Sequence, residues 1–308
     1  MSPDQHRQPE FSSVCALARS KTENRLSSLH AVGLALVLGL VSPFCAAVVG
    51  GAGIDPNIAA SPWAGVGALE NGNGHFSAAL IGPRHVLTAA HVVAGRPIDQ
   101  VAFRLNRGDA EPPIPARAIH IHPDYRGTVR GGLWHDDLAI IELQRPAPAG
   151  TPVYVLYSGF GLKNAQIVFV GYGRAGDGVQ GPVIAASPSV KRIGYNRVKS
   201  LTGKPGSIGR PDIFLFDYDA PANPDQRDGP QGAWGDGLEG TFAGGDSGAP
   251  IFVFNNGGWQ IMGVAAFVIA APDRNGLYGS MAGGMLVPSY LSWLKKVLAQ
   301  SPAAAREN

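Results

Sequence analysis

Cysteine is nearly absent from this chain of 308 residues, which contains only two. Both of them, Cys15 and Cys45, lie within the first 47 residues. If that segment is removed, the remaining chain has no cysteine and can form no disulfide. Its fold must then be stabilised by a buried core alone, and about 260 residues are enough to build one.

A strong excess of charge of either sign is also absent. The formal net charge is +2, and it becomes +1 without the first 47 residues, because these hold four Lys or Arg and three Asp or Glu residues. A nearly neutral chain offers no electrostatic basis for nucleic-acid binding. Long apolar runs are lacking too: the run 31–41 has 11 residues, whereas a transmembrane helix needs about 20.

The N-terminal segment nevertheless has the pattern of an export signal. Basic residues precede the apolar run and the small residues Cys45-Ala46-Ala47 follow it. The basic residues are Arg19, Lys21 and Arg25. This pattern predicts a signal peptide over residues 1–47, cleavage after Ala47, and a secreted or periplasmic protein without stable membrane association. An uncleaved signal anchor is the alternative, but Pro43 and the small residues favour cleavage.

Glycine and proline, in contrast, are abundant, with 42 and 25 residues. Short apolar stretches lie between them, which is typical of many strands joined by tight turns and predicts an all-β barrel or sandwich. The segment 288–300 is the one with clear helical spacing of its apolar residues, and 301–308 is predicted to be a frayed tail. The strand-like runs are 66–69, 79–86, 101–105, 117–121, 138–143, 165–170, 189–194, 213–218, 250–254, 261–267 and 284–287.

Three motifs contain candidate catalytic residues. They are Leu87-Thr88-Ala89-Ala90-His91, Asp136-Asp137-Leu138-Ala139-Ile140-Ile141 and Gly244-Gly245-Asp246-Ser247-Gly248-Ala249-Pro250. A serine hydroxyl is a poor nucleophile at neutral pH, so it needs an imidazole to take its proton and a carboxylate to orient that imidazole. We predict Ser247 as nucleophile, His91 as base and Asp137 as the orienting acid. Asp136 is expected to be a solvated turn residue.

The order His, Asp, Ser and the flanking residues resemble the trypsin/chymotrypsin-like serine peptidases, whereas other serine hydrolases order these residues differently. The resemblance extends over most of residues 48–298. Its further segments are Val48-Val49-Gly50-Gly51, Ser61-Pro62-Trp63, Gly171-Tyr172-Gly173 and Tyr290-Leu291-Ser292-Trp293-Leu294. Ser77 and Val92 stand where the family has a disulfide, which indicates a bacterial-type, disulfide-free member.

The resemblance implies an all-β fold of two six-stranded antiparallel β-barrels. The first is expected at about 48–150 and the second at about 160–287, with a C-terminal helix at 288–300. It also implies an oxyanion hole formed by the backbone N–H groups of Gly245 and Ser247.

Two further expectations follow from the resemblance. The α-amino group of Val48, freed by signal cleavage, pairs with Asp246 and orders the site. The alternative is that Val48 and the residues after it form only strand and turn. The specificity pocket is expected to consist of Thr241, Ala266, Phe267, Val268 and Gly283. Thr241 replaces the aspartate of tryptic members, so we predict small or medium uncharged side chains at the cleavage site.

No cofactor is predicted, because no haem, flavin or nucleotide motif occurs. The acidic residues between 217 and 228 could hold calcium, but their spacing matches no defined loop, and we interpret them as solvated. We therefore predict no metal site. The sequence Gly171 to Gly176 resembles a phosphate loop only superficially, since no helix follows it.

The leading prediction is an exported serine endopeptidase that hydrolyses protein or peptide substrates through an acyl-enzyme. The alternatives are a catalytically silent trypsin-like fold used as a binding or scaffold protein, and an esterase or other acyl hydrolase that uses the same residues. The sequence predicts no particular oligomeric state.

Overall fold

The computed structural model describes residues 48–51, 53–108, 111–127, 129–130, 133–203, 211–220, 239–270 and 274–300. The predicted signal peptide (1–47) and the tail (301–308) lie outside the described residues, as does most of the acidic segment 217–228.

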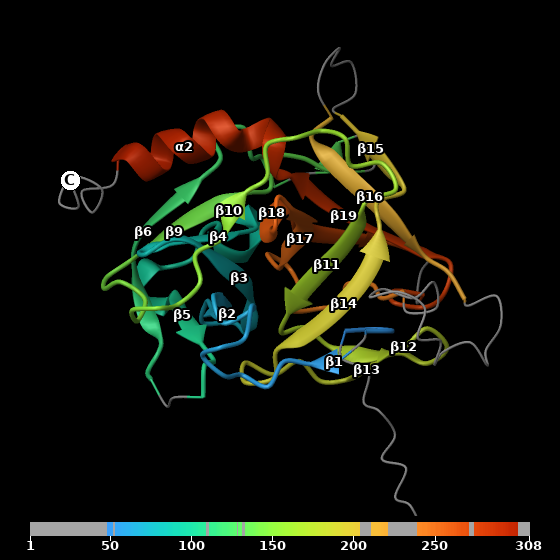
Figure 1. Cartoon of the computed structure of the whole chain (residues 1–308), viewed down its shortest axis with the longest axis horizontal. Coiled ribbons are helices and arrows are strands. Elements are labelled where there is room, and N and C mark those ends of the chain that lie inside the picture. Colours follow the sequence, from blue (N-terminus) through green and yellow to red (C-terminus); the bar gives the residue numbers. More distant parts are fainter. Residues whose placement is uncertain are drawn as a thin grey trace, which may run out of the picture. The chain divides into compact units, whose positions relative to one another are not determined.

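The first half of the described chain forms a closed antiparallel barrel of six strands (Figure 1). In barrel order these are β2 (Val66–Glu70), β3 (His75–Gly82), β4 (His85–Thr88), β9 (Ala139–Leu143), β6 (Ile114–Ile121) and β5 (Ala102–Leu105). The short helix α1 (Ala90–Val93) follows β4, and the 3-10 turn η1 (Ile98–Gln100) precedes β5. The first barrel was predicted correctly.

One predicted strand of this barrel was wrong in its extent. The run 79–86 is divided into β3 and β4 by a turn at Pro83 and Arg84. Proline has no N–H to donate to a ladder, so it is disfavoured inside a central strand. Buried residues lie on both sides of the turn, at the end of β3 and in β4.

The second half forms a nine-stranded sheet that includes the six strands predicted for the second barrel. Six strands form its centre, in the order β14 (Arg192–Arg197), β11 (Gln166–Gly171), β17 (Pro250–Asn255), β18 (Gly258–Ile269), β19 (Ser280–Leu286) and β16 (Ile213–Tyr218). The short strands β1 (Gly53–Ile54), β10 (Val155–Leu156) and β15 (Ser200–Thr202) extend it. Between the outer central strands β14 and β16, the Asn196 amide donates to the carbonyl of Asp217 at 2.8 Å. The predicted six strands therefore correspond to the centre of the sheet.

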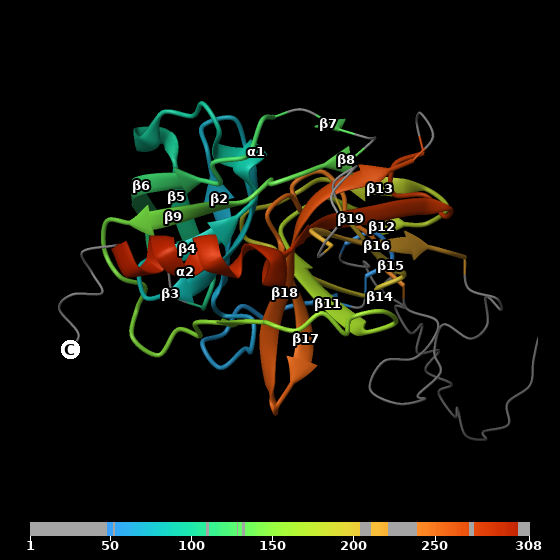
Figure 2. The same ribbon diagram turned by 90° about the horizontal axis from the view of Figure 1, so that it is seen from above.

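Two small hairpins complete the strands: β7 (Val129–Arg130) with β8 (Leu133–Trp134), and β12 (Ala175–Asp177) with β13 (Gly181–Ile184). Both views in Figures 1 and 2 place the first barrel beside the second sheet. The core consists of two buried apolar clusters. The larger one includes residues of the first barrel and of the second sheet, and the other is rich in stacked and edge-on rings. Those rings include Phe169, Phe214, Phe216 and Phe242.

The C-terminal segment forms the expected helix, with one difference at its start. A 3-10 turn, η3 (Val287–Tyr290), precedes α2 (Leu291–Gln300), because Pro288 stands at the first turn. The buried face of α2, Leu294 and Val297, packs into the cluster that fills the first barrel. The fold is thus mostly β with one C-terminal helix, as in chymotrypsin-like proteins.

Candidate active site

His91 and Asp137 are brought together by one antiparallel ladder. β4 pairs with β9 so that Thr88 stands opposite Ala139. His91 follows this pair by three residues on α1, and Asp137 precedes it by two. Both side chains therefore emerge at the same end of the ladder, although 46 positions separate them in the sequence.

The carboxylate of Asp137 holds His91 at two points. The backbone N–H of His91 donates to Oδ1 at 2.8 Å, and the ring Nδ1 lies 2.6 Å from Oδ2. Asp137 is fully buried, whereas 24% of the His91 side chain is exposed. Since an ionised carboxylate only accepts hydrogen bonds, Nδ1 is the donor. In the neutral ring Nε2 is then left as a proton acceptor, which is the tautomer a general base requires.

Asp136 is not the solvated turn residue that the sequence indicated. It is 3% exposed and has a φ of +58°, a backbone conformation that is uncommon outside glycine. Its N–H donates to the hydroxyl of Tyr290 at 3.3 Å, and the same hydroxyl lies 3.3 Å from Oδ1. Because Tyr290 belongs to η3, this contact ties the residue before Asp137 to the C-terminal segment.

The serine segment is a tight turn with glycines where the backbone requires them. Gly245 and Gly248 have φ values of +98° and +83°, which side chains disfavour. The Asp246 N–H donates to the Ala243 carbonyl, and the Ala249 N–H donates to the Asp246 carbonyl, both at 2.9 Å. Ser247 is half-buried at the centre of this turn.

Gly248 packs against the segment that leads to His91. A Cβ atom on Gly248 would lie 2.0 Å from the Thr88 hydroxyl oxygen and 3.1 Å from the Ala89 nitrogen. No side chain fits this space without a shift of the backbone. The residue after Ser247 and the residues just before His91 are therefore in van der Waals contact.

The carboxylate of Asp246 is buried and points away from solvent, with 1% of the residue exposed. Its oxygens accept from the backbone N–H groups of Gly173 and Ala243, each at 2.9 Å. Burial raises the pKa of Asp246 to about 7, against the opposing effect of these hydrogen bonds and of Arg192. A Cβ on Gly171 or Gly173 would lie 2.3 or 2.4 Å from this carboxylate, so both glycines make room for it.

Val48 is completely buried and has a φ of +67°. The next residue, Val49, forms isolated bridges to Thr241 and to Gly176. In the chain described here Val48 is still joined to Ala47 by a peptide bond, so it has no α-amino group. Its pairing with Asp246 therefore remains a prediction.

Residues 49–192 match the model of a protein family described as Trypsin. This match supports the assignment of residues 49–192 to the trypsin/chymotrypsin-like serine peptidase family. The matched residues include His91 and Asp137 and end before Ser247. No curated protein matches the chain. Among the residues that the structure describes, no helix is long and apolar enough to cross a membrane.

Four of the five residues expected to form the specificity pocket of this trypsin-like chain lie on two paired strands, whereas Thr241 forms an isolated bridge to Val49. On β18 and β19, Phe267 stands opposite Gly283 and Val268 opposite Ala282, after a bulge at Ala266. A Cβ on Gly283 would lie 2.5 Å from the carbonyl oxygen of Phe214. Thr241 is fully buried, and its hydroxyl has no hydrogen-bond partner among the described residues.

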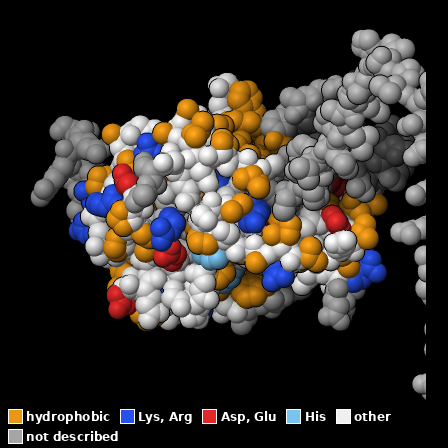
Figure 3. Space-filling view, turned by 90° about the horizontal axis from the view of Figure 1, so that it is seen from below, with side chains coloured by type: hydrophobic (Ala, Val, Ile, Leu, Met, Phe, Trp, Pro, Cys, Tyr) orange, Lys and Arg blue, Asp and Glu red, His pale blue; other side chains and the backbone are white. Residues whose placement is uncertain are grey.

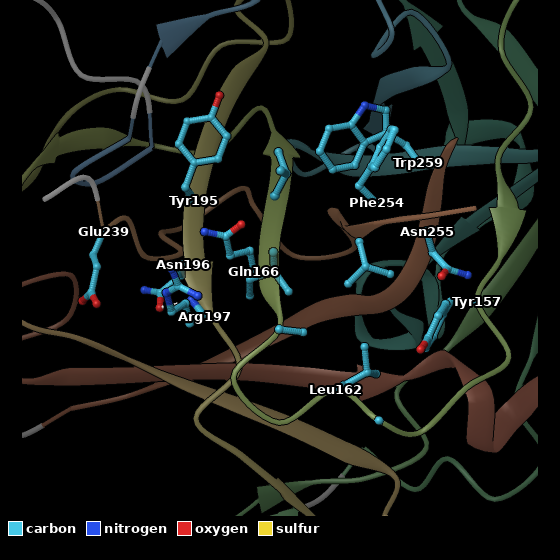
Figure 4. A pocket seen from close by; sticks show the side chains of 15 residues that line it. Tyr157, Leu162, Gln166, Tyr195, Asn196, Arg197, Glu239, Phe254, Asn255 and Trp259 are labelled. Atoms are coloured by element: carbon cyan, nitrogen blue, oxygen red, sulfur yellow. Dashed lines mark hydrogen bonds between the residues drawn. The ribbon is translucent and has the colours of Figure 1, made fainter. Parts of the chain in front are cut away.

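A cavity of about 570 Å³ lies elsewhere on the second sheet (Figure 4). Side chains of β11, β14 and β17 line it, with Phe254 and Trp259 at one end and Glu239 at the other. None of the three predicted catalytic residues lines this cavity. It is therefore not the place where a trypsin-like reaction is expected.

One group of described residues has ligand atoms close enough to share a metal ion. The side-chain ligands of His122, Asp124 and Asp136 lie within 4.8 Å of one another. The carboxylate of Asp136 already contacts the Tyr290 hydroxyl, and we attribute the cluster to the support of the Asp136 turn. In the 217–228 segment, Asp217 forms an ion pair with Lys199, and residues 221–228 lie outside the described part of the chain.

Sequence reasoning missed two residues that contact the catalytic segments. Ser77 was noted only as the position of a missing cysteine, and Tyr290 only as part of the closing helix. Both act through hydrogen bonds to backbone groups far away in the sequence. No local pattern marks such a residue, because its partners are set by the tertiary fold.

Proposed function

We propose that the chain is an exported serine endopeptidase whose catalytic residues are Ser247, His91 and Asp137. The observation that carries this proposal is the 2.6 Å contact between His91 Nδ1 and the fully buried Asp137 carboxylate. The close packing of Gly248 on Thr88 adds to it, since that contact keeps the serine segment next to the histidine segment.

In the proposed reaction, Ser247 Oγ attacks the carbonyl carbon of the scissile peptide bond and its proton passes to His91 Nε2. Asp137 stabilises the imidazolium that forms. The negative charge on the carbonyl oxygen is stabilised by the N–H groups of Gly245 and Ser247. The C–N bond then breaks as His91 gives its proton to the leaving amine, and a water molecule hydrolyses the acyl-enzyme by the same route.

Export and activation are linked in this proposal. Signal cleavage after Ala47 creates the α-amino group of Val48. This residue is already fully buried before cleavage. A positive charge there would offset the cost of burying the Asp246 carboxylate, whose raised pKa of about 7 reflects that cost. N-terminal sequencing of the exported protein tests this step, and a start other than Val48 would contradict it.

Cleavage after small or medium uncharged residues is the proposed specificity. Thr241 offers no charge to Lys or Arg, and neither do Val268 and Ala282, which pair across the two strands. Substrates with Ala, Val or Leu before the cleaved bond should be hydrolysed faster than those with Arg or Lys. Figure 3 shows one face of the molecule, over which side chains of both charge signs are scattered.

Stoichiometric labelling by a fluorophosphonate probe tests the catalytic residues directly. We expect the purified protein starting at Val48 to be labelled at Ser247, and the Ser247→Ala variant not to be labelled. No labelling of folded protein would contradict the proposal and favour the alternative, a binding or scaffold protein with a trypsin-like fold. Parallel assays with ester and peptide substrates separate a peptidase from an esterase.

A further inference from the structure

Ser77 on β3 is fully buried, and every one of its polar atoms has a partner. Its hydroxyl donates to the carbonyl oxygen of Gly245 at 3.0 Å and accepts the N–H of Tyr172, also at 3.0 Å. Its backbone N–H donates to the carbonyl of Ser247 at 3.0 Å. Its carbonyl accepts the hydroxyl of Thr88 at 3.0 Å.

We propose that Ser77 is the positioning residue of the oxyanion hole: it fixes the Gly245–Ser247 loop so that the N–H groups of Gly245 and Ser247 point toward the reacting carbonyl. This inference rests on the proposed peptidase function. Ser77 touches no substrate and acts through the loop.

The hydrogen bonds of the loop show why one residue can have this effect. In the peptide group between Gly245 and Asp246, the oxygen is held by Ser77 and the nitrogen by the carbonyl of Ala243. In the peptide group between Ser247 and Gly248, the oxygen is again held by Ser77, and the nitrogen donates to Ala265. The N–H of Ser247 lies between these two fixed peptide groups.

Gly245 needs such support because its φ of +98° belongs to a conformation that only glycine adopts readily. The same freedom allows the peptide groups beside Gly245 to rotate when their oxygens lose a partner. An oxyanion hole contributes to catalysis only when its donors are aligned before the charge develops. The bond from Ser77 to Gly245 therefore matters for alignment as well as for stability.

Ser77 also joins the loop to the second sheet and the first barrel. Tyr172 follows β11, and its N–H is bound by the same oxygen that donates to Gly245. Thr88 ends β4, three residues before His91. Since no cysteine occurs beyond residue 47, no disulfide can fix this junction, and hydrogen bonds from one buried serine do so instead.

The test compares Ser77→Ala, Ser77→Cys and the matched control Ser61→Ala. Ser61 is also a buried serine whose hydroxyl donates to Asp55 and accepts the N–H of Trp63, away from the loop. Rates are expressed per active site by titration with the fluorophosphonate, and inhibition is measured with a peptidyl boronic acid, which forms a tetrahedral anion on Ser247. Thermal unfolding is recorded for all variants.

We expect Ser77→Ala to lower kcat about tenfold or more, with KM changed less than about twofold. The inhibition constant of the boronic acid should rise by the same factor as kcat falls. The midpoint of the pH–rate profile that reports His91 should be the same as in the unmodified protein. Ser61→Ala should lose thermal stability without losing kcat per active site. If Ser77→Ala does not fold, Ser77→Cys, which has similar volume but a weak donor, should show the same loss.

A Ser77 variant with normal kcat per active site and normal boronic acid binding would overturn the inference, even if its melting temperature were lower. That outcome would leave Ser77 as a purely structural residue. Failure of the unmodified protein to react with the fluorophosphonate would instead contradict the proposed function, so the two failures are distinguishable.

Discussion

The two sides of the candidate active site are held in place by different means. His91 and Asp137 extend from one ladder, β4 with β9, inside a closed barrel. The Ser247 segment is held by bonds from β3, from β18 and from the residues after β11. The proposed base is therefore positioned by local barrel geometry, whereas the proposed nucleophile depends on several elements that must be packed together correctly.

The largest expected effect concerns the barrel side. Asp137→Asn should reduce kcat about 10⁴-fold, because an amide favours the wrong tautomer of His91 and cannot stabilise its charged form. Asp136→Asn is the matched control, since this neighbouring carboxylate contacts Tyr290. It should reduce kcat at most about tenfold. Equal losses in the two variants would show that the assignment of Asp137 is wrong.

The contact between the two sides can be broken at Gly248. Gly248→Ala introduces a methyl group 2.0 Å from the Thr88 oxygen at a φ of +83°. We expect a loss of about 3 kcal/mol in the free energy of unfolding from strain and crowding, together with slow labelling of Ser247. Denaturant unfolding and fluorophosphonate kinetics measure both. The control is Gly257→Ala, since Gly257 also has a positive φ, +77°, but has open space around its Cβ position. If both variants lose the same stability, the contact with Thr88 contributes nothing.

The barrel side could be predicted from the sequence far better than the serine side. His91 and Asp137 precede or follow strands whose apolar pattern is clear, so their meeting follows from the barrel. The depth of Asp136 could not be predicted, because it depends on Tyr290, 154 positions away. The role of Ser77 is equally non-local, with its partner Gly245 168 positions distant.

The errors in the strands have similar causes. The turn at Pro83 was missed because buried strand residues flank it on both sides. The strand expected at 189–194 lies at 192–197 as β14, where Tyr195 and Asn196 pair with β11. Its register is set by that partner strand rather than by its own alternation.

Asp246 allows the serine side to be compared before and after activation. With a pKa raised to about 7, an aspartate binds a proton more tightly in the folded state than in the unfolded state. Its contribution to stability is greatest below about pH 4 and is lost as the pH rises to about 7. A chain starting at Val48 should lose less stability as the pH rises, because its α-amino group pairs with the carboxylate. We expect its free energy of unfolding to be about 2 kcal/mol higher at pH 7.5 than that of a chain without this pair.

The measurement is urea unfolding at pH 4.5 and 7.5 for chains that begin at Val48 and at Ala47. The longer chain is the matched control, since one extra residue displaces the amine. Asp246→Asn should remove the difference between the two chains. Identical pH profiles for the two chains without that substitution would contradict the activation pair.

The smallest expected effect concerns the contact between the barrel side and the C-terminal segment. Tyr290→Phe removes the hydroxyl that accepts the Asp136 N–H, and with it a support of the turn before Asp137. Burial and the nearby carboxylates raise the pKa of Tyr290, so this hydroxyl remains protonated and can also donate. We expect about 1 kcal/mol less stability and a kcat lowered severalfold.

Tyr154→Phe is the control: its buried hydroxyl likewise accepts one N–H, from Gly65, and donates to one carbonyl, that of Pro62. It should lose similar stability without losing kcat. Equal kcat in both variants would mean that the ladder alone positions Asp137, and the contrast between the two sides of the site would then be sharper still.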